Sequence, residues 1–422
     1  MTTLTHATLD LFLYDLREGL GQSQAEISAN RNRFKQKLPN IDSESFEQRD
    51  SLDSETEYLE LLAERTIDFS SKTSQGYYFP VRLNDAYGLL IECELRQAQS
   101  IEQIGWLADL QQTVLNKLNG QTADLGETWL FSAQLPSLSN VSELAQRCAV
   151  TLLNNDNIQI KCQFLEGTLF ECWTRHQQHV IIIFYQQETT EAKIADLYPD
   201  FMHLLVYRHK IMWAYQESRK LKQILKSEAV KTESYRDELN SYMQQRFHAD
   251  KFQQTLQGTW KVLSKYDMGL NDLSYRIRII ETNRHNYAKR LNTLEDKIKQ
   301  ELHCFKYFST KTQDKYLLQV KTDYANLSPE LRSLENMIEY IRASVAIEEE
   351  KRDRSFQNTI ATWGIGLAAG AIVASISGLF PNIPEEINSW ATAGFSIGIS
   401  LLVAIIAGLA TKIWLWWREN ST

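Results

Sequence analysis

The sequence predicts an α/β (or α+β) cytoplasmic domain, followed by long coiled-coil-like helices and a C-terminal two-helix transmembrane hairpin. Three observations predict this fold class. Residues 1–193 alternate between strand-like and helix-like patterns, and residues 194–354 keep a helical period with few breaks. Residues 355–417 then contain two long apolar runs, at 355–379 and 387–413. Each run exceeds the roughly 20 residues that a helix needs to cross a bilayer.

The first region carries the strands. Short apolar or alternating runs predict strands at Leu9–Tyr14, Tyr77–Leu83, Gly88–Leu95, Trp129–Gln134 and Val180–Tyr185, with a hairpin formed by Ile158–Phe164 and Leu169–Trp173. The patterns also predict a polar helix at residues 23–37 and amphipathic helices at 104–118 and 141–152. Residues 40–55 are acidic and rich in serine, which is typical of a linker or flexible loop. The order of the strands in the sheet stays open.

Long helices follow from about residue 197 to 247 and from 253 to 302. The second has apolar residues at heptad spacing, interrupted by Arg284, which favours antiparallel coiled-coil-like packing. We expect a turn at residues 308–312. Ser328-Pro329-Glu330 is typical of a helix start, with a hydroxyl N-cap, a proline in the first turn and an acid after it. From there an apolar seam over residues 331–345 continues toward the two apolar runs.

The charges beside the apolar runs predict an orientation. Lys351, Arg352 and Arg354 precede the first run, and Lys412 and Arg418 follow the second. The loop between them holds only acidic charges. By the positive-inside rule this predicts an integral, multi-pass protein of a bacterial-type inner or plasma membrane, with cytoplasmic N- and C-termini. The alternative is a hairpin buried in a soluble core.

Small residues recur at four-residue spacing in both runs, at 366, 370, 374 and 378 in the first and in two pairs, 394 and 398, then 404 and 408, in the second. Such stripes allow close helix packing in lipid. They predict a homo-oligomer with the lipid bilayer as its surroundings. The alternative is a simple anchor in which the glycines only hold the two spans together.

Composition excludes several function classes. The chain has 422 residues and a formal charge of −8, so the basic patches typical of nucleic-acid binding are not expected. Its five cysteines are odd in number and scattered, which is typical of reduced core thiols. The first ten residues lack the features of a signal peptide. No phosphate-binding glycine loop, nucleophile elbow or zinc-protease motif is present, so we expect neither an enzyme nor a bound cofactor.

Two groups of residues could carry chemistry. Cys172, His176 and His179 have a spacing that a metal site could use, although a tetrahedral zinc site needs a fourth ligand. A buried cysteine with two surface histidines explains them better. The second group could bind an anion, although packing of an aromatic-rich helix on the sheet is favoured. It consists of His203, Arg208, His209 and Lys210.

The order of these parts resembles the CorA family of metal-ion transporters. In that family a cytoplasmic α/β domain is followed by long helices, a stalk helix that runs into the first span, and a second span ending in basic residues. The family's first span ends in Gly-Met-Asn, followed shortly by Met-Pro-Glu. Here the matching stretch, residues 378–385, reads Gly-Leu-Phe-Pro-Asn-Ile-Pro-Glu, so the tripeptide itself is absent. The resemblance implies transport of a divalent or other cation, as permeant or regulatory ion, by a homo-oligomer that is a pentamer in the family.

Two functions follow as hypotheses. The first is an oligomeric CorA-like cation channel or transporter gated by its cytoplasmic domain. The second is a membrane-anchored sensor, effector or scaffold whose hairpin is only a tether. In the first, one helical face would line the pore, polar and then apolar as in a hydrophobic gate. Its residues are Asn358, Thr362, Ile365, Ala369, Ile372, Ile376 and Leu379. The outer mouth would hold Asn382, Glu385 and Glu386. No metal ligands are assigned.

Overall fold

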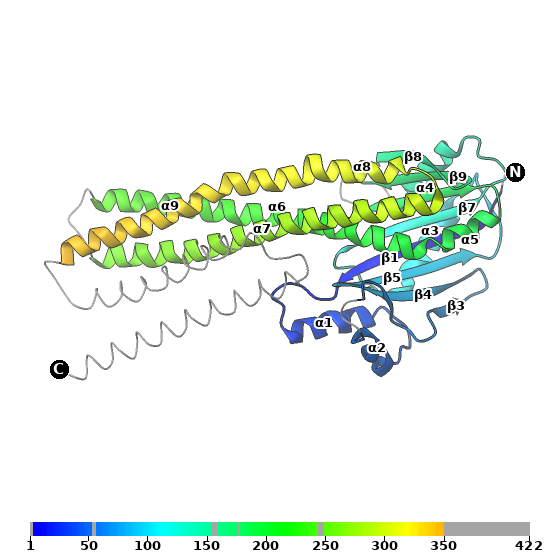
Figure 1. Ribbon diagram of the computed structural model, residues 1–422, viewed down its shortest axis with the longest axis horizontal. Helices are drawn as coiled ribbons and strands as arrows, with labels where there is room; N and C mark the ends of the chain where they lie inside the picture. The colour runs from blue at the N-terminus through cyan, green and yellow to red at the C-terminus, as the bar shows by residue number, and fades with distance from the viewer. Residues whose placement is uncertain (1–2, 53–55, 154–157, 175–177, 244–248, 350–422) are drawn as a thin grey trace. The chain divides into compact units, whose positions relative to one another are not determined.

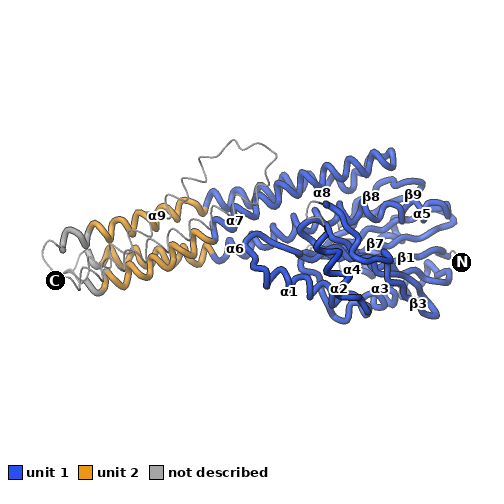
Figure 2. Tube along the Cα trace, turned by 60° about the horizontal axis from the view of Figure 1, so that its bottom comes forward, with its two compact units in different colours: residues 1–224, 269–326 blue, residues 225–268, 327–422 orange. Residues whose placement is uncertain are grey.

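A computed structural model describes residues 3–52, 56–153, 158–174, 178–243 and 249–349. The chain forms two compact units (Figure 2). Unit 1 comprises residues 1–224 and 269–326, and unit 2 comprises residues 225–268 and 327–422. The α/β domain belongs to unit 1, and both units contain stretches of the long helices.

Unit 1 is built on a mixed sheet whose main path runs in the order β2-β4-β5-β1-β7-β10-β9-β8. All neighbours on this path pair antiparallel except β10 and β7, which are parallel. The strands are β1 (Thr3–Leu16), β2 (Leu59–Glu60), β3 (Ile67–Ser70), β4 (Ser74–Leu83), β5 (Ala86–Leu95), β6 (Gln99–Ser100), β7 (Gly126–Gln134), β8 (Ile158–Phe164), β9 (Gly167–Trp173) and β10 (His179–Tyr185). Each strand and hairpin expected from the sequence is confirmed, and β10 is an interior strand as its unbroken apolar run predicts.

Helices cover both faces of this sheet (Figure 1). On one face α3 (Gly105–Lys117) and α4 (Val141–Leu153) bury their apolar stripes against alternate strand residues. Leu11, Ile91 and Phe184 lie on this side. On the other face, Phe12 makes edge-on ring contacts with Tyr198 and Phe201 of α6. Because strand side chains alternate, neighbouring residues of one strand serve two different cores.

Two short helices follow β1. α1 (Gln24–Lys35) falls within the helix expected at residues 23–37 and begins with a capping box made by Ser23 and Glu26. α2 (Ser43–Asp50) lies inside the stretch expected to be a flexible loop, so that expectation is wrong. The reason is tertiary: Phe46 is buried beside Phe34, and the buried Asp50 carboxylate accepts hydrogen bonds from Arg17 and other donors. Composition alone does not reveal such contacts.

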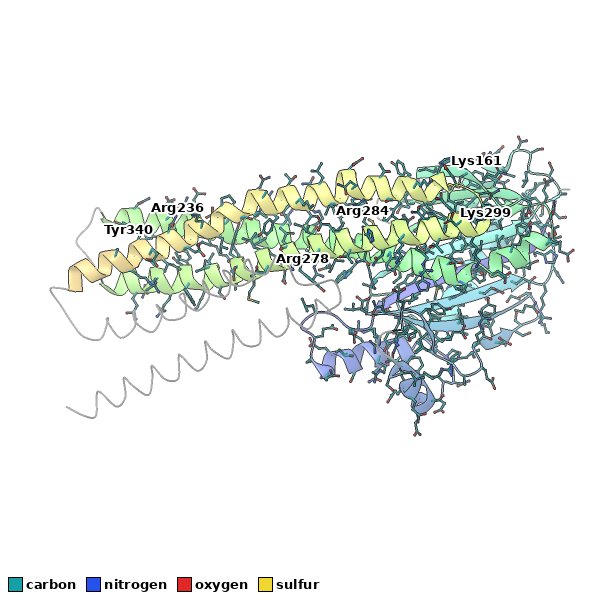
Figure 3. The ribbon with its side chains drawn as sticks, in the orientation of Figure 1. Lys161, Arg236, Arg278, Arg284, Lys299 and Tyr340 are labelled. Carbon is teal, nitrogen blue, oxygen red and sulfur yellow. A yellow bond between two sulfur atoms is a disulfide. The ribbon has the colours of Figure 1, made fainter. Side chains whose placement is uncertain are left out.

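The helical region begins with the short α5 (Thr189–Ala195), which leads into α6 (Tyr198–Met243). After α6 come α7 (Ala249–Ile298) and α8 (His303–Lys311). A π-helix, η1 (Thr312–Leu317), then continues into α9 (Leu318–Glu349). The three long helices are confirmed. Most of the heptad residues of α7, among them Leu273, Ile280 and Leu294, are buried. Arg278 and Arg284 lie along the same helix (Figure 3).

Two boundaries differ from those expected. Residues 308–312 belong to α8 and the start of η1 instead of forming a turn. Pro329 lies inside α9, so Ser328 does not cap a new helix. The Tyr266 hydroxyl donates a hydrogen bond of 2.9 Å to the Leu327 carbonyl, and Arg236 donates one of 2.8 Å to Ser333. Packing within unit 2 thus carries the helix through the proline, where a helix otherwise tends to break or kink.

The membrane part of the predicted fold class needs correction. Across the described ranges, which end at residue 349, we find no helix that combines the length and apolar character needed to cross a membrane. The fold of these residues is therefore an α/β domain with long helices, and the predicted transmembrane hairpin is not part of it. The runs at 355–379 and 387–413 lie outside the described residues.

The cysteine prediction also fails in part. Cys162 of β8 and Cys304 of α8 form a disulfide, although 142 positions separate them. Cys93, Cys148 and Cys172 are free and buried, as expected for core thiols. Scattered spacing could not show the pair, because only the fold brings α8 onto β8.

Candidate ligand-binding pocket

A pocket of about 410 Å³ lies in unit 1 where the end of β9 meets α6, α8 and η1. This volume falls in the range of small-molecule sites. Most of its lining residues are aromatic, cationic or part of one buried polar network. The lining residues are Glu171, Trp173, Thr174, Arg208, His209, Met212, Tyr215, Tyr307, Phe308, Lys311, Lys315 and Tyr316.

Helical spacing explains how three segments contribute. Arg208, Met212 and Tyr215 follow one another at four and three residues on α6, so they share a face. α8 buries Cys304, Phe305 and Phe308. The π-helix then sets the positions of Lys315 and Tyr316. Short π-helical segments are frequent at functional sites, because they alter side-chain positions within a helix.

The aromatic side chains form one wall. The rings of Trp173 and Tyr307 stack with centroids 5.6 Å apart and planes 25° apart. The Lys311 ammonium lies 4.9 Å from the Trp173 ring centre and 5.9 Å from that of Tyr307. A flat ligand ring can stack on such a wall.

The pocket carries excess positive charge. Its lining contains three cations, Arg208, Lys311 and Lys315, and one acid, Glu171. Burial and the charges of Arg208 and Lys315 lower the pKa of Lys311. Among the described residues, no carboxylate lies within ion-pair distance of Lys311 or Lys315 in the way that Glu171 pairs with Arg208. The two ammonium groups are therefore open to an anionic ligand.

A buried hydrogen-bonded network forms the floor. Glu171 Oε1 accepts a bond of 2.9 Å from Arg208 Nη1, and His179 Nε2 lies 3.1 Å from the same oxygen. The Thr128 hydroxyl lies 2.8 Å from His179 Nδ1 and 2.8 Å from His209 Nε2. This chain links four elements: β9, α6, β10 and β7.

The network fixes its proton positions when Glu171 is ionised. His179 then donates from Nε2 to Glu171, Thr128 donates to His179 Nδ1, and His209 donates from Nε2 to Thr128. Both imidazoles are neutral in this arrangement. Burial, together with the Arg208 charge, lowers the pKa of His179 and of His209, which agrees with it.

Glu171 is the unusual member. Burial raises its pKa to about 7, although the charges of Arg208 and Lys311 act in the opposite direction. Its second oxygen, Oε2, is buried and has no hydrogen-bond partner within the described part of the chain. Buried polar atoms are nearly always satisfied, so a ligand or water donor is expected here. The residue lines the pocket.

The sequence analysis predicted part of this site. Of the four residues proposed for anion binding, Arg208 and His209 line the pocket. Lys210 instead pairs with Asp85, and His203 Nδ1 lies 3.0 Å from the Pro199 carbonyl oxygen. The remaining lining residues were missed. A detectable signal was the mixture of aromatic and basic residues over 305–316, of which only residues 308–312 were expected to form a turn.

The proposed metal spacing is not assembled. Cys172 packs in the core of the α3 and α4 face, whereas the preceding residue, Glu171, faces α6 and hydrogen-bonds to His179. His176 lies outside the described residues. The predicted pore-lining residues, from Asn358 to Leu379, and the outer-mouth residues Asn382, Glu385 and Glu386 also lie outside them. Those assignments stay predictions, as do the membrane localisation and the oligomer.

Comparison with known proteins gives little further guidance. No family model and no curated protein matches the chain. Among solved structures, one similar chain is the complete structure of the CorA magnesium transporter from Methanocaldococcus jannaschii, at 11% identity and a TM-score of 0.19. The match covers 69% of this chain and 90% of that one. A match at this TM-score carries no argument about the fold, the family or the function of this chain.

Proposed function

We propose that this protein is a sensor whose α/β domain binds a small anionic molecule with a flat ring, such as a mononucleotide. The observation that supports the proposal is the pocket itself. It places three cations and an aromatic wall around one buried carboxylate that has an unsatisfied oxygen.

Each part of such a ligand has a counterpart. The ring stacks beside Trp173 and Tyr307, since flat rings gain dispersion and electrostatic contact on aromatic side chains. A phosphate or carboxylate binds the ammonium groups of Lys311 and Lys315. An N–H of the ring donates to Glu171 Oε2 and satisfies it.

Binding, and not catalysis, is the role we assign. Burial lowers the pKa of His179 and of His209, which makes each a weak base, and both are hydrogen-bonded within the network. The helices that line the pocket also offer a route for a response. α6 continues beyond the pocket to Met243, and η1 leads without a break into α9, which ends at Glu349. A continuous helix is stiff, so a change at its pocket end acts along its length.

The experiment is calorimetric titration of the full chain with a panel of mononucleotides and with the matching uncharged nucleosides. We expect at least one nucleotide to bind, and its nucleoside to bind at least tenfold more weakly, because each lost charge-assisted contact is worth about 1.5–3 kcal/mol. Lys311→Ala should weaken nucleotide binding by a similar factor. Lys306→Ala is the matched control, since Lys306 is on the same helix but outside the pocket and pairs with Glu295.

Two results would overturn the proposal. One is the absence of binding by every panel member at millimolar concentration. The other is equal binding of nucleotide and nucleoside, which would show that the cations do not recognise the ligand. Hydrogen exchange then tests the sensor role, because a bound nucleotide should alter protection in η1 and in α9 over residues 318–349. Protection confined to the pocket would indicate a binding site without a transmitted response.

A further inference from the structure

A second group of polar side chains lies on unit 1, apart from the pocket. His6 of β1, Glu94 of β5 and Glu191 of α5 bring three potential metal-ligand atoms within 4.8 Å of one another. His6 Nδ1 lies 3.0 Å from Glu191 Oε2 and 3.9 Å from Glu94 Oε1. All three side chains are half-buried, so an ion can reach them from solvent.

The fold, and not local sequence, creates this cluster. The pairing of β1 with β7 shifts register between Thr5 and Thr8, and His6 there has a φ of 48°. Glu94 lies on the neighbouring strand β5, opposite Thr8. The Gln75 side chain donates a hydrogen bond of 2.8 Å to Glu94 Oε2, leaving Oε1 toward His6. Outer hydrogen bonds of this kind orient metal-binding carboxylates.

An independent observation points to a missing ligand at this place. Tyr185 of β10 is completely buried, and its hydroxyl has no hydrogen-bond partner among the described residues. Burial raises the pKa of this phenol, and the charges of Glu191, Glu94 and Asp10 add to the rise, so the hydroxyl lies in the electrostatic field of these carboxylates. A buried hydroxyl without a partner calls for a water or an ion beside it.

The acidic charge here is also poorly balanced. Glu92 and Asp10 face each other across β5 and β1, and Asp10 Oδ1 is a second buried oxygen without a partner. For Glu94 and Glu191, the side chain found within ion-pair distance in the described residues is His6. A divalent ion would balance this charge.

We propose that His6, Glu94 and Glu191 form a binding site for a divalent transition-metal ion, with Zn²⁺ as the best-fitting member of that class. One imidazole and two carboxylates, with a position left for water or substrate, form a ligand set that zinc uses. In a tetrahedral site with bonds of about 2.0–2.2 Å, ligand atoms lie roughly 3.3–3.5 Å apart. The observed separations lie on either side of this value, so small side-chain rotations close the site.

Mg²⁺ fits less well. It prefers six oxygen ligands in a near-octahedral arrangement and keeps several waters, and it rarely takes an imidazole nitrogen. The site is separate from the proposed nucleotide pocket, since no residue lines both. Failure of the metal-site proposal would therefore leave the proposal of nucleotide binding unaffected.

The test is metal binding by the chelator-treated, desalted full-length protein, with bound metal measured after equilibrium dialysis against Zn²⁺. We expect one tightly bound zinc per chain that 1 mM Mg²⁺ does not displace. Glu191→Gln and His6→Ala should each weaken that binding at least tenfold, because each removes a direct ligand. Circular dichroism of the two variants should match that of the native chain.

His303→Ala is the matched control, because His303 also lies within 4 Å of a glutamate, Glu301, but in an exposed pair outside the cluster. Co²⁺ substitution gives a second readout, since tetrahedral nitrogen and oxygen ligation produces visible absorption that His6→Ala should abolish. Stoichiometric zinc that survives Glu191→Gln and His6→Ala would overturn the proposal. So would the absence of zinc binding, which would show that the three residues form an ion pair only. Displacement of zinc by equimolar Mg²⁺ would overturn the metal assignment.

Discussion

The guanidinium of Arg208 donates a hydrogen bond of 2.9 Å to the carboxylate of Glu171, and both side chains are buried. The same guanidinium lies 4.2 Å from the centre of the Phe308 ring. Arg208 comes from α6, Glu171 from β9 and Phe308 from α8, so the pair joins the sheet to two helices. Removing one partner of such a buried pair leaves an uncompensated charge, whereas the net contribution of the intact pair is smaller.

This pair predicts a specific dependence of stability on pH. The pKa of Glu171 is about 7 in the folded chain, against an ordinary value of 4.5. Between these values the folded state holds a proton that the unfolded state has released. The contribution of Glu171 to stability is therefore full below pH 4.5 and is lost as the pH rises through 7. The total change is about 3 kcal/mol.

Glu171→Gln isolates this effect. We expect the unfolding free energy of the native chain to fall relative to that of the variant as the pH rises from 5 to 8. Urea unfolding at each pH measures both values. The lowered pKa values of His179 and His209 act in the opposite direction, with stability lost as the pH falls below 6.5, but they are present in both proteins and largely cancel. A difference that stays constant over this range would show that Glu171 does not retain its proton.

How much of the fold the sequence predicts depends on where the determining contacts lie. The alternation in β1, the unbroken apolar run of β10 and the heptads of α7 are local patterns, and each predicted its element correctly. α2 was missed because its stability comes from distant partners of Asp50 and Phe46. The continuation of α8 into η1 was missed because residues 308–312 resemble a turn when they are read without their neighbours.

The residues of the candidate pocket likewise fall into those that a local sequence pattern indicates and those that only the fold brings together. Arg208 and His209 attracted attention because charged and aromatic residues cluster around them in the sequence. Glu171 did not, since a single acid inside an apolar strand gives no sign of its partners. Its importance arises from the pairing of β9 with β10 and from the packing of α6 over them, which bring His179 and Arg208 to one carboxylate. Long-range contacts of this kind are not encoded in spacing.

Gly126→Ala tests the close approach of β7 to the network. Gly126 has a φ of 144°, and a Cβ atom built there would lie 2.4 Å from His209 Nδ1. We expect a loss of about 1–3 kcal/mol in unfolding free energy, because the backbone is strained and the imidazole must move. The displaced His209 should also weaken nucleotide binding. Gly105→Ala, at an open helical position, is the control and should be neutral or slightly stabilising. Equal stability of both variants would contradict the geometry.

Asp50→Ala tests the contacts that hold α2. The Asp50 carboxylate accepts bonds of 3.0 Å from Arg17, 2.8 Å from Arg31 and 2.9 Å from Tyr87. Removing it leaves two cations and a buried hydroxyl without their acceptor, so we expect a loss of about 3–5 kcal/mol in chemical unfolding. Glu47→Ala is the control on the same helix, and it should change stability far less, because Glu47 is exposed and solvent screens its pair with Lys35. Similar effects of the two substitutions would show that α2 does not depend on Asp50.

The disulfide between Cys162 and Cys304 joins β8 to α8, the helix that carries Tyr307, Phe308 and Lys311 of the pocket. It closes a loop of 142 positions, so it restricts the unfolded chain strongly. Reduction should lower the unfolding free energy by about 2–4 kcal/mol, and it should weaken nucleotide binding because α8 loses its covalent link to the sheet. Urea unfolding and calorimetric titration, each with and without reductant, measure both effects. The double variant Cys162→Ser and Cys304→Ser is the control: it should match the reduced native chain and should not respond to reductant. If the native chain also fails to respond, although thiol titration shows the two cysteines reduced, then packing alone holds α8 in place.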